Sequence, residues 1–211
     1  EFTAATLLAT PVSGTVEYDG DAFYLTPMAG GSASGRAVVR AAHMILTPAA
    51  ERTLAQTTSA QAIFDDPTNG TITLTGSTTY AMEGMLVITN TAAPSASHSY
   101  SLLFDYSGSL LSLSYNVDAS VTDGSPQAAA ITRSFGTSAS ALTVSGSSTE
   151  SNEVAVFMIR GILRTDTTGT FTPQIQFDTN APGGTSTVAV NSYLALVPMG
   201  TSTMVSVGNW S

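Results

Sequence analysis

Apolar and polar residues alternate with a period of two along much of this chain. In residues 71–75, Ile72 and Leu74 point to one side of an extended segment and the threonines point to the other. This alternation is typical of a strand that is buried on one face. Residues 79–89 and 188–199 predict two long strands, and Gly84 predicts a bulge or a bend in the first of them.

Two further segments indicate where strands lie within a sheet. Residues 153–165 are apolar at both odd and even positions, which predicts a central strand. Phe171, Ile175 and Phe177 share one face of the next segment. Pro173 cannot donate a backbone hydrogen bond there, so it predicts an edge strand or a bulge.

Short turn signals connect several of these segments. Residues 99–106 and 109–117 flank Ser107-Gly108, a spacing that predicts a β-hairpin. Near the N-terminus, residues 15–18 and 22–25 flank Asp19-Gly20, a pair that favours a tight turn. Two strands alone are marginally stable in water, so we expect this first hairpin to pack against another surface.

A glycine- and serine-rich run at residues 29–35 divides the chain into two parts. Such a run is typical of a linker, because small residues cannot build a core. Residues 36–47 allow either a helix or a strand, and their β-branched residues favour an extended segment. We therefore predict a hairpin module with its linker over residues 1–35 and a second domain over residues 36–211.

The pattern as a whole predicts an all-β protein. Roughly eight to ten strands separated by turn signals are expected between Arg52 and Ser211. This number fits an antiparallel, jelly-roll-like β-sandwich that follows the small N-terminal hairpin module.

Two parts of the sequence resemble proteins of tailed bacteriophages. The segment TPVSGTVEYDGDAFYLT, residues 10–26, resembles a module of tail fibres and other appendages. GILRTDTTGTFTPQIQF, APGGTSTVAVNSYLALVPMG and the closing VGNWS are similar to a terminal β-domain of phage proteins. The resemblance implies a virion structural protein and a homotrimer, because fibre-like phage proteins usually have three subunits. Candidate subunit-interface residues are Val16, Tyr18, Phe23, Tyr24, Leu25 and Trp210.

The charge balance narrows the range of partners. The chain is 43% hydrophobic and only 10% charged, it has no lysine among its six basic residues, and its formal net charge is −9. Nucleic acids and anionic lipids attract clustered positive charge, so neither is expected as a partner. The chain has no cysteine, which excludes disulfides and thiolate metal sites. The sequence contains no run of about 18 apolar residues, so no membrane-spanning segment is predicted.

Side chains suited to catalysis are few. His43 is interpreted as a packed residue and His98 as a solvated loop residue. Two carboxylate pairs are close enough in sequence to be considered for catalysis. Asp65 and Asp66 precede a proline and fit a turn, and Glu150 and Glu153 flank a serine-rich loop, so a structural role is preferred for both pairs. We therefore predict a protein that is not an enzyme, with no cofactor and no metal site.

Exposed aromatic residues are a common feature of sugar-binding surfaces. Tyr100, Tyr106 and Tyr115 lie in the segments around Ser107-Gly108 and are candidates for surface or receptor contact. Leu102 and Phe104 share a face with Tyr100 and Tyr106, and such a mixture of aromatic and aliphatic residues is equally typical of a protein core. Packing is therefore the preferred interpretation.

The resemblance to phage appendage proteins implies a virion protein of the tail-fibre or receptor-binding type. Its expected partners are further copies of itself, other virion proteins that bind its N-terminal module, and a host cell-surface glycan or protein. A capsid head-fibre or decoration protein is the alternative, and a fibre-borne polysaccharide depolymerase is the least favoured reading. The chain begins at Glu1-Phe2 without an initiator methionine, so we expect an upstream region to be missing.

Overall fold

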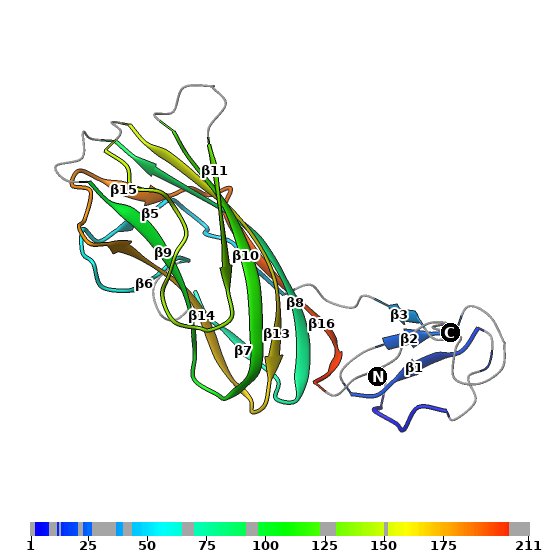
Figure 1. Cartoon of the computed structure of the whole chain (residues 1–211). Helices are drawn as coiled ribbons and strands as arrows, with labels where there is room; N and C mark the ends of the chain where they lie inside the picture. Colours follow the sequence, from blue (N-terminus) through cyan, green and yellow to red (C-terminus); the bar gives the residue numbers. More distant parts are fainter. Residues whose placement is uncertain are drawn as a thin grey trace.

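A computed structural model describes residues 3–8, 12, 14–20, 23–26, 37–39, 44–64, 70–91, 97–122, 130–149 and 152–202. All regular secondary structure in these ranges is β-strand, and every strand pairing is antiparallel. The strands form a large two-sheet body and a small separate sheet at one end of it (Figure 1).

The strands are short near the N-terminus and long in the body. The first eight are β1 (Val16–Tyr18), β2 (Phe23–Leu25), β3 (Ala37–Val39), β4 (Met44–Leu46), β5 (Arg52–Leu54), β6 (Gln61–Ala62), β7 (Ile72–Leu74) and β8 (Thr78–Asn90). The others are β9 (Ser99–Tyr106), β10 (Leu110–Thr122), β11 (Ile131–Gly136), β12 (Leu142–Thr143), β13 (Val154–Thr165), β14 (Gly169–Asp178), β15 (Ser186–Val188) and β16 (Tyr193–Thr201).

The body is a β-sandwich with the strand order of a jelly roll, as expected. The larger sheet has eight strands and contains the run β13-β8-β16-β4; the smaller sheet has five and contains β12-β9-β14, followed by β6 and β7. Along the chain, β4, β7, β8, β9, β12, β13, β14 and β16 move between the sheets as two Greek keys do. β10 and β11 are inserted between β9 and β12 and extend the larger sheet beyond β13.

The core lies between the two sheets and is rich in aromatic rings. Phe104 of β9 meets Tyr115 of β10 edge to face, with ring centroids 4.8 Å apart, and stacks on Phe171 of β14 at 5.6 Å. Each of these side chains is at most 1% exposed. The predicted alternation of residues 71–75 and the predicted long strand at residues 79–89 are confirmed, and Leu74, Met82, Leu86 and Ile88 are buried in this core.

The predicted hairpin around Ser107-Gly108 is wrong. β9 pairs with β12 and β14, whereas β10 pairs with β11 and β13, so the chain crosses between the sheets at this turn. The physical reason is the position of the aromatic side chains: Phe104 and Tyr115 approach each other across the core. In a hairpin, all of them would lie along a single sheet.

The bulge predicted at Gly84 and the edge position predicted for Pro173 also need correction. The register of β8 is continuous at Gly84 on both sides, so no bulge occurs there. Instead, a Cβ atom at this residue would lie 2.7 Å from both the Leu194 side chain and the Tyr193 carbonyl, so glycine permits the close approach of β16. Pro173 lies in an interior strand rather than at an edge; it falls between the stretch of β14 paired with β7 and the stretch paired with β6.

The N-terminal sheet contains the predicted hairpin. β1 pairs with β2 from Val16↔Leu25 to Tyr18↔Phe23, and Gly20 in the connection has a φ of 107°, which favours glycine. β3 adds a third strand beside β2. The extended structure expected for residues 36–47 is thus confirmed where β3 and β4 lie. The expected linker, residues 29–35, lies outside the described residues.

Candidate functional site

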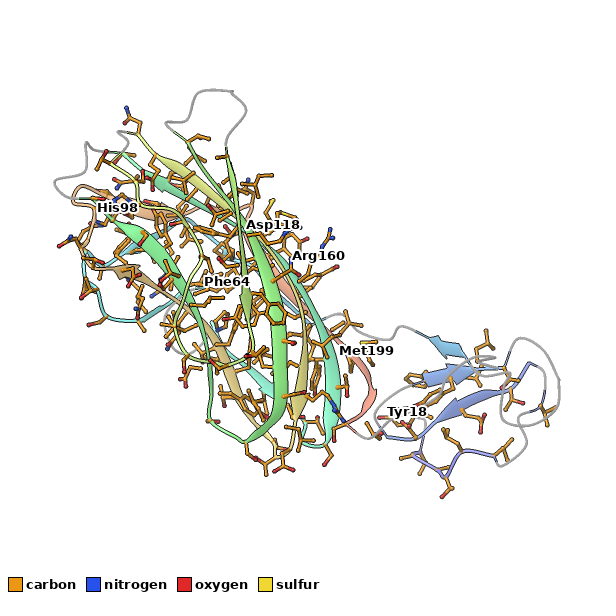
Figure 2. All side chains as sticks on the ribbon, in the orientation of Figure 1. Tyr18, Phe64, His98, Asp118, Arg160 and Met199 are labelled. Carbon is orange, nitrogen blue, oxygen red and sulfur yellow. The ribbon has the colours of Figure 1, made fainter. Side chains whose placement is uncertain are left out.

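The largest concentration of reactive side chains is buried at one end of the sandwich. Glu153, just before β13, is 0% exposed, and it accepts hydrogen bonds from three neighbours. Tyr100 of β9 donates to Oε1 at 2.6 Å, His98 Nε2 lies 3.2 Å from the same oxygen, and Ser148 donates to Oε2. Figure 2 marks this end of the molecule by its His98 label.

Backbone pairing holds this polar network in place. His98 and Ser148 exchange two backbone hydrogen bonds of 3.0 and 2.7 Å in an isolated bridge. Their side chains therefore point together at Glu153, while the Tyr100 ring packs edge to face on Phe157. Because Tyr100 belongs to the smaller sheet and Phe157 to the larger, the network links the two sheets.

Electrostatics favour an ionised carboxylate in this network. Burial alone would raise the pKa of Glu153, but the hydrogen bonds from His98, Ser148 and Tyr100 hold that pKa below its usual range. Burial and the neighbouring carboxylate raise the pKa of Tyr100 above its usual range, so this phenol remains a donor. The network thus satisfies a charge that would otherwise be costly in the core.

The geometry of this network suits structural support better than nucleophilic catalysis. Ser148 donates its hydroxyl proton to Glu153 rather than to His98, so a serine activated by histidine is not formed. A cleft of about 280 Å³ lies beside the network, lined by Ser148 with Thr132, Ser147 and Thr149. The carboxylate does not line this cleft. The expectation that His98 is a solvated loop residue is wrong, since it is 1% exposed.

The tyrosines considered for receptor contact separate into two kinds. Tyr100 and Tyr115 are 0% and 1% exposed, so the surface-contact hypothesis is wrong for both, and the packing interpretation holds. The aromatic residues along β9 face inward because they fill the space between the sheets. Tyr106, at the end of β9, is half-buried and donates its hydroxyl proton to the Thr167 carbonyl oxygen at 2.6 Å.

The candidate interface residues of the N-terminal sheet are also not equivalent. Val16 and Leu25 are exposed, and the half-buried rings of Tyr18 and Phe23 stack with centroids 4.7 Å apart. Tyr24 is only 2% exposed and donates to Asp19 at 2.8 Å, so it is buried within its own chain rather than available to a partner. Trp210, His43, Asp65, Asp66 and Glu150 lie outside the described residues.

The outer face of the larger sheet is a feature that the sequence interpretation missed. The outward side chains of β13 are its even-numbered residues, and Met158 and Ile162 among them are 39% and 38% exposed. Cross-strand pairing aligns Met158 with Met85 of β8 and with Tyr193 of β16. We define the apolar stripe as Ile45, Met85, Val156, Met158, Ile162 and Tyr193.

The outer face of the smaller sheet has a different character. Outward positions of β14 are Thr172, Gln174 and Gln176, and their cross-strand partners on β9 include Asp105. Leu103 is the one large apolar side chain at the outward positions of β9 within the described ranges. This face resembles an ordinary solvated surface, with hydroxyl, amide and carboxylate groups.

Nowhere in the described part of the chain do three histidine, aspartate or glutamate side chains gather as metal ligands. None of its elements is a helix long and apolar enough to cross a membrane.

Comparison with known proteins gives no further assignment. No family model, no curated protein and no solved structure matches this chain.

Proposed function

We propose that this chain is a structural protein of a tailed-bacteriophage virion, of the tail-fibre or receptor-binding type. The observation that carries the proposal is the two-part arrangement of the molecule. The segment that resembles a phage appendage module supplies β1 and β2 of a small N-terminal sheet, and a jelly-roll sandwich follows that sheet. In this proposal the small sheet binds another virion protein and the sandwich contacts the host surface as part of a homotrimer.

The mechanism in this proposal is passive, multivalent binding. Three copies on one fibre raise a weak single-site affinity through effective concentration, without any new contact. The outer face of the smaller sheet offers Thr172, Gln174 and Gln176, whose hydroxyl and amide groups suit hydrogen bonding to sugars or to protein loops. The formal charge of −9 disfavours attraction to anionic surfaces, so polar contacts rather than charge would provide specificity.

Immunogold electron microscopy of particles from the phage that carries this protein tests the proposal. Antibodies raised against the full chain should label the tail, and the purified chain should compete with those particles for adsorption to their host. Label on the tail together with lost adsorption would support a receptor-binding fibre. Label on neither tail nor capsid would contradict the virion assignment.

A capsid head-fibre or decoration protein is the second candidate, and one observation favours it. The N-terminal module exposes Leu8, Val12, Val16 and Leu25, which are between 38% and 59% exposed. Apolar residues gathered on so small a module are suited to packing on a larger protein surface, such as a capsid lattice. Gold label on the capsid, with host adsorption unaffected by the purified chain, would select this candidate.

A further inference from the structure

We propose that the outer face of the larger sheet is the surface through which copies of this chain bind one another. The sequence alone placed the subunit contacts in the N-terminal hairpin and at Trp210. The structure offers a larger surface in the sandwich itself, centred on the apolar stripe. The number of subunits rests on the proposed function, whereas the identity of the face does not.

The first argument is the unequal coverage of β13. Its odd-numbered residues fill the core, and Phe157, Ile159 and Leu163 are at most 1% exposed. Its even-numbered residues are also mostly apolar, but in the single chain Met158 and Ile162 remain open to solvent. A strand with apolar residues on both faces is typical of a sheet that is covered on both sides.

The second argument is the arrangement of apolar and polar residues across the face. The stripe crosses β13, β8, β16 and β4, and β10 beside it presents Ser114, Asn116, Asp118 and Ser120. Farther out, β11 exposes Ile131 and Phe135, which are 69% and 65% exposed. Arg160 on β13 and Glu83 on β8 stand among the apolar residues, and an apolar patch that includes an arginine is common in protein–protein interfaces.

The third argument is charge, and it favours a second copy of this chain over another partner. Among the described residues of β4, β8, β10, β11, β13 and β16, Arg133, Arg160 and Arg164 lie on this face with only Asp118 and Glu83 as counter-charges, in a chain of net charge −9. The described outward positions of β9 and β14 carry the carboxylates of Asp105 and Asp178 and no arginine. Identical acidic chains repel one another least where their basic residues gather.

The charges on this face also offer complementary pairs to a neighbour. Arg133 donates to both Asp118 oxygens at 2.6 and 3.0 Å, so that pair is satisfied within the chain. Arg160 and Glu83 lie opposite each other on β13 and β8 but form no ion pair within the residues that the structure describes. Figure 2 places Arg160 and Asp118 on the outer side of this sheet, away from the buried Phe64.

The size of the face is that of a self-association surface. Five spacings separate the six strands from β11 to β4, which gives about 24 Å, and the long strands run about 40 Å, so the whole face is comparable with the roughly 800 Å² per partner of a standard interface. In a trimer this area is divided between two neighbours. Around a threefold axis, the β11 side of each copy would meet the β4 side of its neighbour. Exposed apolar residues stand at both sides: Phe135 on β11 and Ile45 on β4.

Light scattering on the full chain tests this inference with a matched pair of variants. Met158→Asp places a charge in the centre of the apolar stripe, whereas Leu103→Asp makes the same change on the outer face of the smaller sheet. We expect the intact chain and L103D to have three times the 21.6 kDa chain mass and M158D to dissociate to the monomer. Phe135→Ser is a second variant, whose 65% exposure makes it compatible with folding; it should raise the dissociation constant at least about tenfold.

The outcomes separate this inference from the proposed function. Trimeric M158D and F135S would overturn the inference and leave the virion assignment standing. A dimer that M158D dissociates would keep the face and contradict the homotrimer. An intact chain that is monomeric at every concentration would overturn both the face and the trimer, whereas the immunogold result would still decide the virion assignment.

Discussion

The two outer faces of the sandwich rest on the same core but present different chemistry. On the smaller sheet, β14 presents threonine and glutamine outward, as a strand with one solvated face does. On the larger sheet, β13 presents Val156, Met158 and Ile162 outward beside arginines. Inward packing alone therefore does not explain the sequence of the larger sheet, and we propose that a further contact explains its outward residues.

The largest expected effect comes from the core that both faces share. Phe104 stacks on Phe171 and meets Tyr115 across the sheets. Phe104→Ala should lower the free energy of unfolding by about 3–5 kcal/mol, because it leaves a cavity between the sheets. Chemical denaturation of the variant measures this loss. A loss below about 1 kcal/mol would contradict the packing described for the core.

The polar network should have the next largest effect, because it links the two sheets at one end. Glu153→Gln removes the buried charge that accepts hydrogen bonds from His98, Tyr100 and Ser148, and it should cost about 1–3 kcal/mol. Denaturant unfolding at neutral pH gives the value. Equal stability of the variant and the intact chain would show that the network contributes nothing.

The pH dependence of stability provides a second test of the Glu153 network. The folded-state pKa of Glu153 lies below its unfolded value of about 4.3, so its stabilisation is complete above that pH. The stabilisation is lost as the pH falls through the lower folded pKa, because the protonated carboxyl no longer gains from these donors. The difference in stability between the intact chain and E153Q should therefore narrow on acidification from neutral pH. A constant difference would assign the effect to packing instead.

Two buried tyrosines, one from each sheet, give a smaller and more selective comparison. The Tyr100 hydroxyl donates to Glu153, whereas the buried Tyr115 hydroxyl has no hydrogen-bond partner in the described structure. Tyr100→Phe should cost about 1–3 kcal/mol, and Tyr115→Phe should be neutral or stabilising within about 1 kcal/mol. Thermal unfolding of both variants checks the order. A larger loss for Tyr115→Phe would contradict it.

Making the polar face resemble the apolar one should change association more than stability. The triple variant Thr172→Val, Gln174→Met and Gln176→Val creates an apolar row along β14, at positions that already lie in a strand. We expect little change in unfolding free energy but new self-association, seen as a higher sedimentation coefficient at high concentration. An unchanged coefficient would show that apolar side chains alone do not make such a face adhesive.

The sequence predicted the strands more reliably than their pairing. Alternation in residues 71–75 identified β7, because one face of that strand is buried, and the long run of strand-forming residues at 79–89 identified β8. The pairing of β9 with β10 was predicted wrongly, since a short turn is equally compatible with a hairpin and with a crossing between sheets. The structure distinguishes the two by long-range contacts: the strand pairings of β9 and β10 in different sheets and the contact of Phe104 with Tyr115 across the core.

The candidate sites were harder to predict for a related reason. His98 and Glu153 are 55 residues apart, and nothing local to either one signals their contact. The apolar stripe was partly visible in residues 153–165, whose two apolar faces correctly predicted a central strand. That pattern did not indicate which of the two faces is open to solvent, where Met158 and Ile162 are exposed.

The central claim is that the outer face of the larger sheet joins copies of this chain. Because the chain has no cysteine, single substitutions Met158→Cys and Leu103→Cys provide clean probes of the two faces. The measurement is the rate of maleimide labelling as the protein concentration rises. The account predicts that labelling of M158C slows with assembly while that of L103C stays constant. Rates that stay constant at both positions, or slow equally at both, would contradict it.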